Sequence, residues 1–294
     1  MSSLEYIEQP NARAIVAPDF AASLRELGAL DSASWSAHFD DSRPQGEGRR
    51  PIAMPTLEGG TDLVLRRFHH GGSLAHILGA TLRSPRRLFD EFRVHYELAT
   101  RGTPVPQPAF AVAHRAGARW TGGIATVRIP DAVDGFGFLE AGPSSTNLGR
   151  CVEAAGHALR SFHDAGGRHA DLHIANLLVR QRDAIEVFVI DLDRARIGPP
   201  PSIARRAREI GRLGRSLHKR GLQPDPIDTA AVEQFLSAYA DHDPAGLRTL
   251  RTRLRFESLR TAVHRAGYAL RPRRATPHGG SPSNPEGDPQ RTRR

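Results

Sequence analysis

Asp171, Asn176 and Asp191 have the residue types and the spacing that phosphoryl transfer from a nucleotide requires. The apolar runs at residues 174–179 and 185–190 predict two short strands joined by a polar turn, which would bring these side chains to one end of a hairpin. In this chemistry a carboxylate orients the acceptor hydroxyl, while an asparagine and a second carboxylate hold Mg²⁺. We therefore predict Asp171 as the catalytic residue, Asn176 and Asp191 as metal ligands, and ATP with Mg²⁺ as the cofactors.

Shorter parts of the same stretch are compatible with other chemistry. Asp191 and Asp193 alone would also suit the metal-binding pair of a glycosyltransferase or the start of a phosphatase nucleophile motif. His169 and His173 have the i, i+4 spacing of a metal pair, but the usual glutamate beside the first histidine is missing. A histidine in front of a catalytic aspartate is more often a structural hydrogen-bonding group. The complete order H-x-D-L-x-x-x-N, then an aspartate after a strand, is typical of protein kinases.

Composition limits the other possibilities. The chain has 294 residues, one cysteine and a net charge of +9, which predicts a protein without an intrachain disulfide in a reducing compartment. Its first ten residues do not resemble a secretory signal, and no apolar run is long enough to cross a bilayer, so we expect a soluble, cytoplasmic protein. With 6% aromatic residues and no aromatics interleaved with the arginines, a nucleic-acid partner is not expected.

The first half of the chain should bind the nucleotide phosphates. Gly46 and Gly48 lie in a polar loop that could cover the phosphates, although an ordinary turn explains them equally well. A strand is expected at residues 61–68. Lys219 is the only lysine in the chain, so an arginine on this strand must supply the cation that a kinase takes from lysine. Arg66 is the candidate, with Arg67 as the alternative.

The strand cation needs an acidic partner. The helix predicted at residues 86–99 carries two candidates, Glu91 and Glu97. The segment 127–130 would be the hinge that holds adenine through its backbone.

The second half reads as mainly helical, with helices predicted at residues 151–165, 203–220, 229–239 and 246–266. The helix at 203–220 has an apolar stripe and, beside it, five basic residues interrupted by Glu209: Arg205, Arg208, Arg212, Arg215 and Lys219. This basic stripe is either a solvated face or a surface for an anionic partner.

Several of these stretches together resemble the 3-deoxy-D-manno-octulosonic acid (Kdo) kinases of the lipopolysaccharide kinase group. The similar segments are residues 63–72, 89–93, 102–108, 169–176, 190–194 and, more weakly, 215–219. The resemblance places the catalytic aspartate on Asp171, the metal ligands on Asn176 and Asp191, and the phosphate-binding pair on Arg66 and Glu91 rather than Glu97. Two positions depart from the family: Leu192 stands in place of phenylalanine and His173 in place of asparagine.

The resemblance implies an α+β, two-lobed protein-kinase-like fold with a small β-rich N-lobe and a larger helical C-lobe. We expect an N-terminal extension at residues 1–40, the N-lobe at 41–130, the C-lobe at 131–270 and a disordered tail at 271–294.

The implied activity is ATP-dependent phosphorylation of a hydroxyl of Kdo on a Kdo–lipid A precursor. The expected location is peripheral, on an anionic membrane surface at the cytoplasmic face of the inner membrane, with no obligate protein partner. Two alternatives remain: a kinase for another sugar or small-molecule acceptor, and a pseudokinase that binds nucleotide without catalysis.

Overall fold

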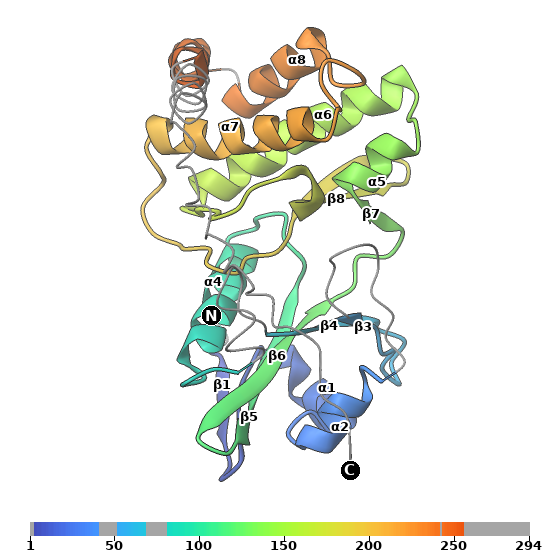
Figure 1. Cartoon of the computed structure of the whole chain (residues 1–294), viewed down its shortest axis with the longest axis vertical. Coiled ribbons are helices and arrows are strands. Elements are labelled where there is room, and N and C mark those ends of the chain that lie inside the picture. Colours follow the sequence, from blue (N-terminus) through green and yellow to red (C-terminus); the bar gives the residue numbers. More distant parts are fainter. Residues whose placement is uncertain (1–2, 41–51, 69–80, 242, 256–294) are drawn as a thin grey trace, which may run out of the picture. The chain divides into compact units, whose positions relative to one another are not determined.

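The computed structural model describes residues 3–40, 52–68, 81–241 and 243–255. The chain divides into two compact units, residues 1–257 and 258–294, and the second lies outside the described residues. The predicted disordered tail at 271–294 also lies outside them, and the helix predicted at 246–266 is described as far as residue 255. Within the first unit, a β-sheet region is followed along the chain by a mainly helical region, in agreement with the predicted α+β fold (Figure 1).

The N-lobe is built on a six-stranded antiparallel sheet with the order β1-β2-β5-β6-β4-β3. The strands are β1 (Glu5–Glu8), β2 (Ala12–Val16), β3 (Ile52–Ala53), β4 (Leu63–Arg67), β5 (Pro108–Ala116) and β6 (Arg119–Val127). The alternating residues of β4 explain its place in the sheet, since Leu63 and Leu65 are fully buried while their neighbours are half-buried. The predicted strand at residues 61–68 is therefore confirmed with slightly shorter bounds.

The sequence predicts an N-terminal extension at residues 1–40, and the sheet topology corrects that boundary. Strand β2 pairs with β5 along its whole length, and Ile15 and Val16 are fully buried in the N-lobe core. The short helices α1 (Ala21–Glu26) and α2 (Ser32–Ala37) follow, and Trp35 of α2 packs edge-on against Phe110 of β5. Residues 3–40 are thus part of the N-lobe, because their apolar side chains complete its core.

Helix α4 (Arg86–Thr100) is the one long helix of the described N-lobe residues, and it matches the predicted helix. Leu88, Phe92 and Leu98 bury its apolar face, which is the 3.6-residue periodicity read from the sequence. Two polar residues, Glu91 and His95, are buried on the same helix. A buried acid requires a partner, so this helix already indicates where a cation must lie.

The C-lobe carries the predicted hairpin, which consists of β8 (Leu177–Gln181) and β9 (Ile185–Val189) with β7 (Ala132–Asp134) on its other side. Its helices are α5 (Gly135–Glu140), α6 (Ser145–Asp164), α7 (Ile203–Lys219) and α8 (Thr229–Ala240), and residues 244–255 are also helical. The short helix η2 (Ile174–Asn176) leads into β8. Among the described residues, no helix combines the length and apolar character needed to cross a membrane.

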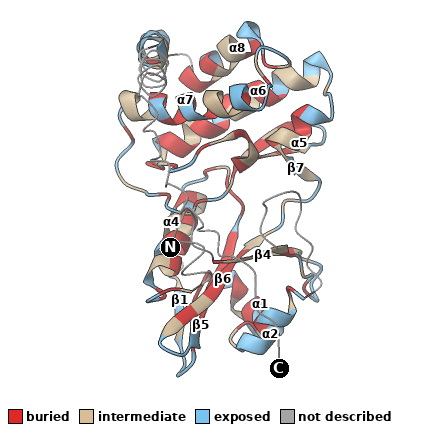
Figure 2. Ribbon diagram, in the orientation of Figure 1, coloured by how far each residue is buried: buried red, intermediate tan, exposed pale blue. Residues whose placement is uncertain are grey.

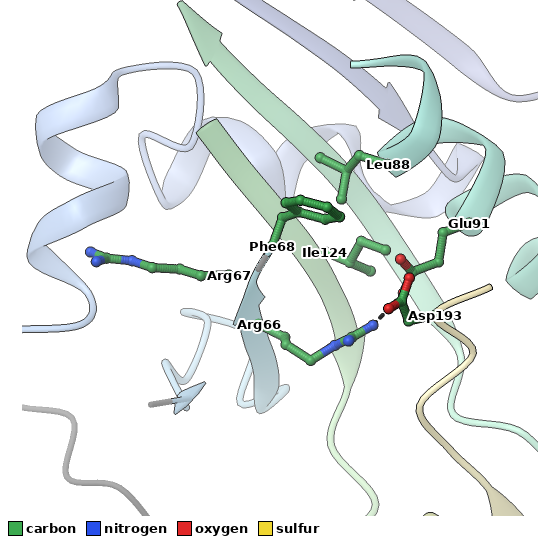
Figure 3. Close-up of a pocket in the computed structure, with 7 residues that line it drawn as sticks. All are labelled: Arg66, Arg67, Phe68, Leu88, Glu91, Ile124 and Asp193. Carbon is green, nitrogen blue, oxygen red and sulfur yellow. Dashed lines mark hydrogen bonds and ion pairs between the residues drawn. The ribbon is translucent and has the colours of Figure 1, made fainter. Parts of the chain in front are cut away.

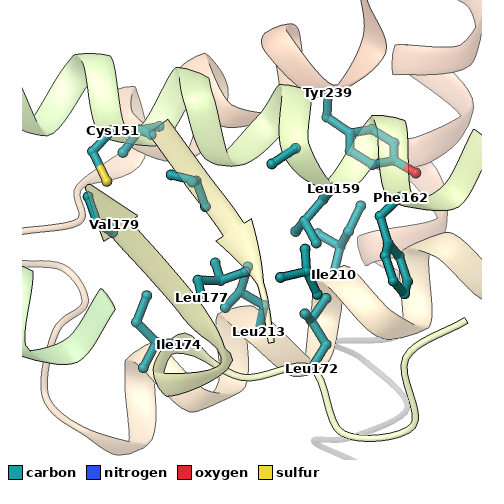
Figure 4. Close-up of a cluster of buried hydrophobic side chains, with 14 of the residues drawn as sticks. Cys151, Leu159, Phe162, Leu172, Ile174, Leu177, Val179, Ile210, Leu213 and Tyr239 are labelled. Atoms are coloured by element: carbon teal, nitrogen blue, oxygen red, sulfur yellow. The ribbon is translucent and has the colours of Figure 1, made fainter. Parts of the chain in front are cut away.

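The core of the C-lobe lies between the hairpin and helices α6 and α7. Figure 4 shows Leu159 and Phe162 of α6 and Leu213 of α7 converging on Leu172 and Leu177. Leu159, Phe162 and Leu172 are fully buried. In Figure 2 red marks the inner faces of α6 and α7, and along the hairpin red alternates with tan. This packing supports the loop at residues 169–176, which carries the predicted catalytic group.

Candidate active site

The β8–β9 hairpin brings the predicted catalytic and metal-binding segments together. Leu177 is paired with Val189, and just beyond this pair the Ile190 amide donates to the Asn176 carbonyl at 2.9 Å. The Asn176 side-chain amide in turn donates to the carbonyl oxygen of Asp171 at 2.9 Å. Asp171, Asn176 and Asp191 therefore gather at one end of the hairpin, as the sequence predicted from the spacing of the two strands.

His169 connects the two segments as a structural group. Its Nδ1 accepts a hydrogen bond from the Asp171 amide at 3.1 Å, and its Nε2 donates to the Ile190 carbonyl at 3.0 Å. Burial lowers the pKa of His169, so the neutral ring with a proton on Nε2 satisfies both bonds. Both nitrogens are occupied within the protein, which fits the interpretation of His169 as a hydrogen-bonding residue rather than a metal ligand.

Glu209 of α7 anchors the beginning of the same loop. Its carboxylate accepts from the His169 amide at 2.8 Å and from Nε2 of the fully buried His163 at 3.3 Å. Burial raises the pKa of Glu209, but the hydrogen bonds from His163 and His169 outweigh it and leave the pKa lowered. Tyr239 of α8 completes the network, since its hydroxyl donates to His163 Nδ1 at 2.7 Å. The catalytic loop thus rests on a buried charged network.

In the sequence, Glu209 is only the acid that interrupts the basic stripe. That interruption was the available signal, because an acid beside an apolar stripe can be buried only where it has partners. The sequence did not indicate a second α7 residue, Ser216. Its hydroxyl oxygen accepts a hydrogen bond from the Ile174 amide at 3.0 Å and so holds the middle of the loop. Helix α7 therefore positions the loop from two points.

Asp171 itself is exposed. Its side chain is 69% accessible, and its Oδ1 accepts from Nη1 of Arg212 at 2.9 Å. The same Nη1 donates to the carbonyl oxygen of Ala170 at 2.8 Å. His173 Nε2 lies 4.0 Å from the other oxygen, Oδ2. Ion pairs this exposed contribute about 0–1 kcal/mol to stability, so the Arg212 contact leaves Asp171 accessible to a ligand.

On the N-lobe side, Arg66 of β4 reaches the predicted acidic partner. Arg66 Nη2 pairs with Glu91, and Nη1 lies 3.1 Å from Asp191 Oδ1. Figure 3 shows the Arg66 side chain directed toward Glu91 and Asp193, while Arg67 extends the opposite way. Arg67 instead donates to the Ser36 carbonyl at 3.1 Å and lies over the ring of Phe39. Since neighbouring strand residues face opposite sides, only Arg66 of these two can face the helix.

The Arg66–Glu91 pair is the buried electrostatic feature of the site. The Glu91 side chain is 6% exposed, and burial raises its pKa while Arg66 opposes the shift. Burial disfavours the charge on Arg66, but Glu91 and Asp191 outweigh it, so the guanidinium pKa is raised. Glu97, the alternative acid, pairs with Arg101 on the helix surface. The structure therefore brings together Arg66, Glu91 and Asp191 and leaves Arg67 and Glu97 outside the group.

Two residues after Asp191, Asp193 makes a further link to helix α4. Its Oδ1 accepts from Nη2 of Arg87 at 2.8 Å. Between the two aspartates, Leu192 is buried in the C-lobe core, so this leucine occupies an apolar position. Asp191 itself has a φ of 58°, in the left-handed region that a non-glycine residue adopts only when its surroundings hold it there. The Arg66 and Arg87 contacts on either side are such surroundings.

Two further predictions concern the nucleotide. Gly46 and Gly48 lie outside the described residues. In the predicted hinge, two amides are already occupied: Val127 donates to the Gln107 carbonyl at 2.8 Å and Arg128 to the Asp62 carbonyl at 2.9 Å. Residue 130 is a proline and has no amide, so within the described residues Ile129 is the one position of this segment whose amide has no backbone hydrogen bond.

The donor set fits Mg²⁺. This ion prefers oxygen ligands and is usually held by one or two protein groups plus substrate phosphates. Asn176 and Asp191 supply an amide oxygen and a carboxylate at the end of the hairpin, and the Asp191 side chain is 47% exposed. Among the described residues, no cluster of three or more histidine, cysteine or acidic side chains suits an all-protein metal site. These residues therefore suit a metal ion whose remaining ligands are phosphate oxygens.

Comparison with known proteins assigns more than half of the chain to one family. The model of the "Lipopolysaccharide kinase (Kdo/WaaP) family" matches residues 37–239. A 3-deoxy-D-manno-octulosonic acid kinase of Stenotrophomonas maltophilia is 33% identical over 198 residues, covering 66% of this chain and 76% of that protein. The corresponding kinase of Xylella fastidiosa is 31% identical over 202 residues, with coverage of 66% and 76%.

Among solved structures, WaaP in complex with acyl carrier protein superposes with a TM-score of 0.54 at 20% identity. It covers 88% of this chain and 100% of its own, and it confirms the kinase-like α+β fold. The matched region contains the loop at 169–176, the hairpin and the Arg66–Glu91 pair. The chain belongs to the lipopolysaccharide kinase (Kdo/WaaP) family and is a phosphotransferase that acts on a sugar hydroxyl.

Proposed function

We propose that this protein transfers a phosphoryl group from ATP to a hydroxyl of Kdo on a Kdo–lipid A precursor. The observation that carries the proposal is the contact of Arg66 with both Glu91 and Asp191. It joins a buried acid of the N-lobe to the end of the hairpin that also holds Asp171 and Asn176. The choice of acceptor rests on family membership and on the relatives that bear the name Kdo kinase.

Each residue has a role that its position allows. Asp171 orients the acceptor hydroxyl and accepts its proton, because its side chain is 69% exposed and Arg212 contacts only its Oδ1. Asn176 and Asp191 hold Mg²⁺, which neutralises charge on the phosphates when it is bound. Arg66, fixed by Glu91, binds phosphate oxygens with its planar fork. The His169 ring holds the Asp171 and Asp191 segments next to each other, because Nδ1 accepts from the Asp171 amide and Nε2 donates to the Ile190 carbonyl.

The pseudokinase alternative depends on the missing strand lysine, and the geometry of Arg66 weakens it. Arg66 supplies the positive charge that a lysine would provide, and it pairs with Glu91, the acid expected to hold that cation. The other alternative is a kinase for another sugar or small-molecule acceptor. Arg212 beside Asp171 argues against the cationic members of that class, such as choline and aminoglycosides, since a positive side chain repels them.

We further propose that the protein works at the cytoplasmic face of the inner membrane, bound peripherally to its anionic surface. Arg208 and Lys219 of α7 are exposed. Each basic residue near such a surface contributes about 1 kcal/mol of binding. Two other residues of the basic stripe contact acids of the site, since Arg205 pairs with Glu209 and Arg212 with Asp171. Arg208 and Lys219 are the stripe residues that we propose for binding lipid.

The test is transfer of labelled γ-phosphate from ATP to purified Kdo–lipid A precursor by the chain alone. Product that depends on Mg²⁺ and on that acceptor is the expected result. Nucleotide binding without transfer to any acceptor would favour the pseudokinase, and transfer to choline or an aminoglycoside would favour the other acceptor class. The structure similar to this one contains an acyl carrier protein, so a parallel assay with that protein added tests our expectation of no obligate protein partner.

Asp191→Asn provides the metal control for the same assay. Because it removes the charge at the proposed metal ligand, we expect a higher Mg²⁺ concentration for half-maximal rate. An unchanged Mg²⁺ dependence would remove Asp191 from that role.

A further inference from the structure

Arg212 lies beside the proposed catalytic carboxylate, and the proposed reaction assigns it no task. It comes from α7, forty-one residues after Asp171, and its side chain is 49% exposed. Its two recorded hydrogen bonds both use Nη1, to Asp171 and to the Ala170 carbonyl. Within the described residues, no hydrogen bond is recorded for its Nε or Nη2. Part of the guanidinium is thus held in place while the rest can bind a ligand.

The geometry around Asp171 places an acceptor next to this group. Arg212 contacts Oδ1, whereas Oδ2 has only the His173 ring, at 4.0 Å, among its recorded neighbours in the described chain. An acceptor hydroxyl would therefore bind at Oδ2. A sugar held by that hydroxyl would have its other substituents within reach of the Arg212 guanidinium, because the guanidinium is hydrogen-bonded to the second oxygen of the same Asp171 carboxylate.

The chemistry of arginine then defines the ligand. A guanidinium binds carboxylate and phosphate groups through parallel hydrogen bonds, and its charge makes each bond stronger. The nucleotide is an unsuitable ligand for Arg212, since Arg66 and Asp191 provide the phosphate side of the site. The exposed pair with Asp171 is weak, so an anionic group can compete for the guanidinium without displacing a buried contact.

We propose that Arg212 binds an anionic group of the acceptor, either the sugar carboxylate or a phosphate of the lipid, and so makes the enzyme specific for acidic acceptors. The inference rests on the proposed function, because it takes Asp171 as the group that receives the acceptor hydroxyl. The proposal concerns Arg212 alone, because the exposed Arg208 and Lys219 of the same helix make no hydrogen bond or ion pair with Asp171 in the described chain.

The experiment compares Arg212→Gln with the wild type and with Arg253→Gln, a matched loss of one exposed arginine on the helix at residues 244–255, to which no acceptor or lipid contact is assigned. Three acceptors are used: the Kdo–lipid A precursor, the same molecule with its carboxylate reduced to an alcohol, and the same molecule without its lipid phosphates. Wild type and Arg253→Gln should prefer the intact acceptor by about 10–100-fold in kcat/KM over one of the two altered acceptors, which is the worth of one charged hydrogen-bonding contact. In Arg212→Gln that preference should disappear while the KM for ATP is unchanged.

The altered acceptor against which the preference disappears identifies the anionic group. If Arg212→Gln slows transfer to all three acceptors by the same factor, Arg212 only orients Asp171 and the inference is overturned. The same holds if the variant keeps the wild-type preference. If wild type transfers phosphate to no Kdo acceptor, the proposed function fails and the inference fails with it. Thermal unfolding of both variants confirms that they are folded, which is expected because both side chains are exposed.

Discussion

The two sides of the candidate site are built differently. On the nucleotide side, the charged groups are partly or fully buried, with Glu91 at 6% exposure and Arg66 at 30%. On the acceptor side, Asp171 is 69% and Arg212 49% exposed. There the loop backbone, rather than the charged side chain, is held by buried groups such as Glu209.

This difference in exposure suits the ligand that we propose for each side. Every reaction uses the same phosphates, so a cation fixed by a buried acid can be ready before the nucleotide arrives. The acceptor is larger and must reach the catalytic carboxylate, so that carboxylate lies open on an anchored loop. A buried charge that loses its partner is costly, whereas an exposed pair contributes about 0–1 kcal/mol. Mutations on the two sides should therefore separate stability from activity.

The largest effect is expected for Asp171→Asn. Loss of the general base should lower kcat by about 10²–10⁴, with the KM for ATP nearly unchanged. Because the side chain is exposed, the free energy of unfolding should change by less than about 1 kcal/mol. Kinetics and denaturant unfolding check both values, with Asp183→Asn in the exposed hairpin turn as the control. A large loss of stability would show that the acceptor side is not built as described.

Arg66→Ala should affect activity and stability together. We expect kcat/KM for ATP to fall about 10²-fold, as for the loss of one charge-stabilising donor. Glu91 would remain buried without its cation, which should cost about 2 kcal/mol of unfolding free energy, less than for a fully buried pair because Arg66 is partly exposed. Arg67→Ala is the matched control and should spare the KM for ATP. Wild-type kinetics in Arg66→Ala would assign the phosphate contact to another cation.

A pH experiment sharpens the comparison on the buried side. His95 of α4 donates from Nε2 to the Pro106 carbonyl at 2.7 Å, and burial lowers its pKa from 6.5 to about 4. Between these pH values the unfolded chain binds a proton that the folded chain does not. Stability contributed by neutral His95 is therefore complete above pH 6.5 and is lost as pH falls toward 4, by roughly 3 kcal/mol in total.

The check is the unfolding free energy of wild type and His95→Gln from pH 7.5 to 4. Glutamine can donate to the same carbonyl but does not titrate, so the difference between the two proteins should show the lost stability. If the two curves run parallel, His95 does not hold helix α4 through its neutral form.

The smallest effect is expected at the outer surface of α7. Reversal of Arg208 and Lys219 to glutamate should weaken binding to anionic liposomes roughly 30-fold. Each basic residue contributes about 1 kcal/mol of binding free energy, and the loss of two such contributions corresponds to about that factor. The KM for ATP should not change, and added salt should reduce the wild-type affinity. Arg25→Glu with Arg83→Glu gives the same charge change on exposed N-lobe residues. Equal losses in both double variants would mean that net charge, and not this helix, determines membrane binding.

The sequence by itself determined the catalytic hairpin and the main helices. Asp171, Asn176 and Asp191 lie within about twenty residues, and two short strands around one turn suffice to bring them together. The apolar periods of α4, α6 and α7 are likewise local. Helices α4 and α7 appear within one residue of their expected bounds, whereas α6 begins six residues before the predicted start at 151. The stretches that resemble Kdo kinases also indicated Glu91 in place of Glu97.

Only the tertiary structure decided which cations serve the site. Arg66 and Arg67 are adjacent, and a shift of one residue in strand register exchanges the faces on which they lie, so pairing of β4 with β6 was needed to choose between them. Arg212 looked like its neighbours in a basic stripe until α7 packed against the loop and placed one of the five beside Asp171. Strands β1 and β2 joined the N-lobe for the same reason: long-range pairing depends on which apolar surfaces remain uncovered, and no local pattern records that.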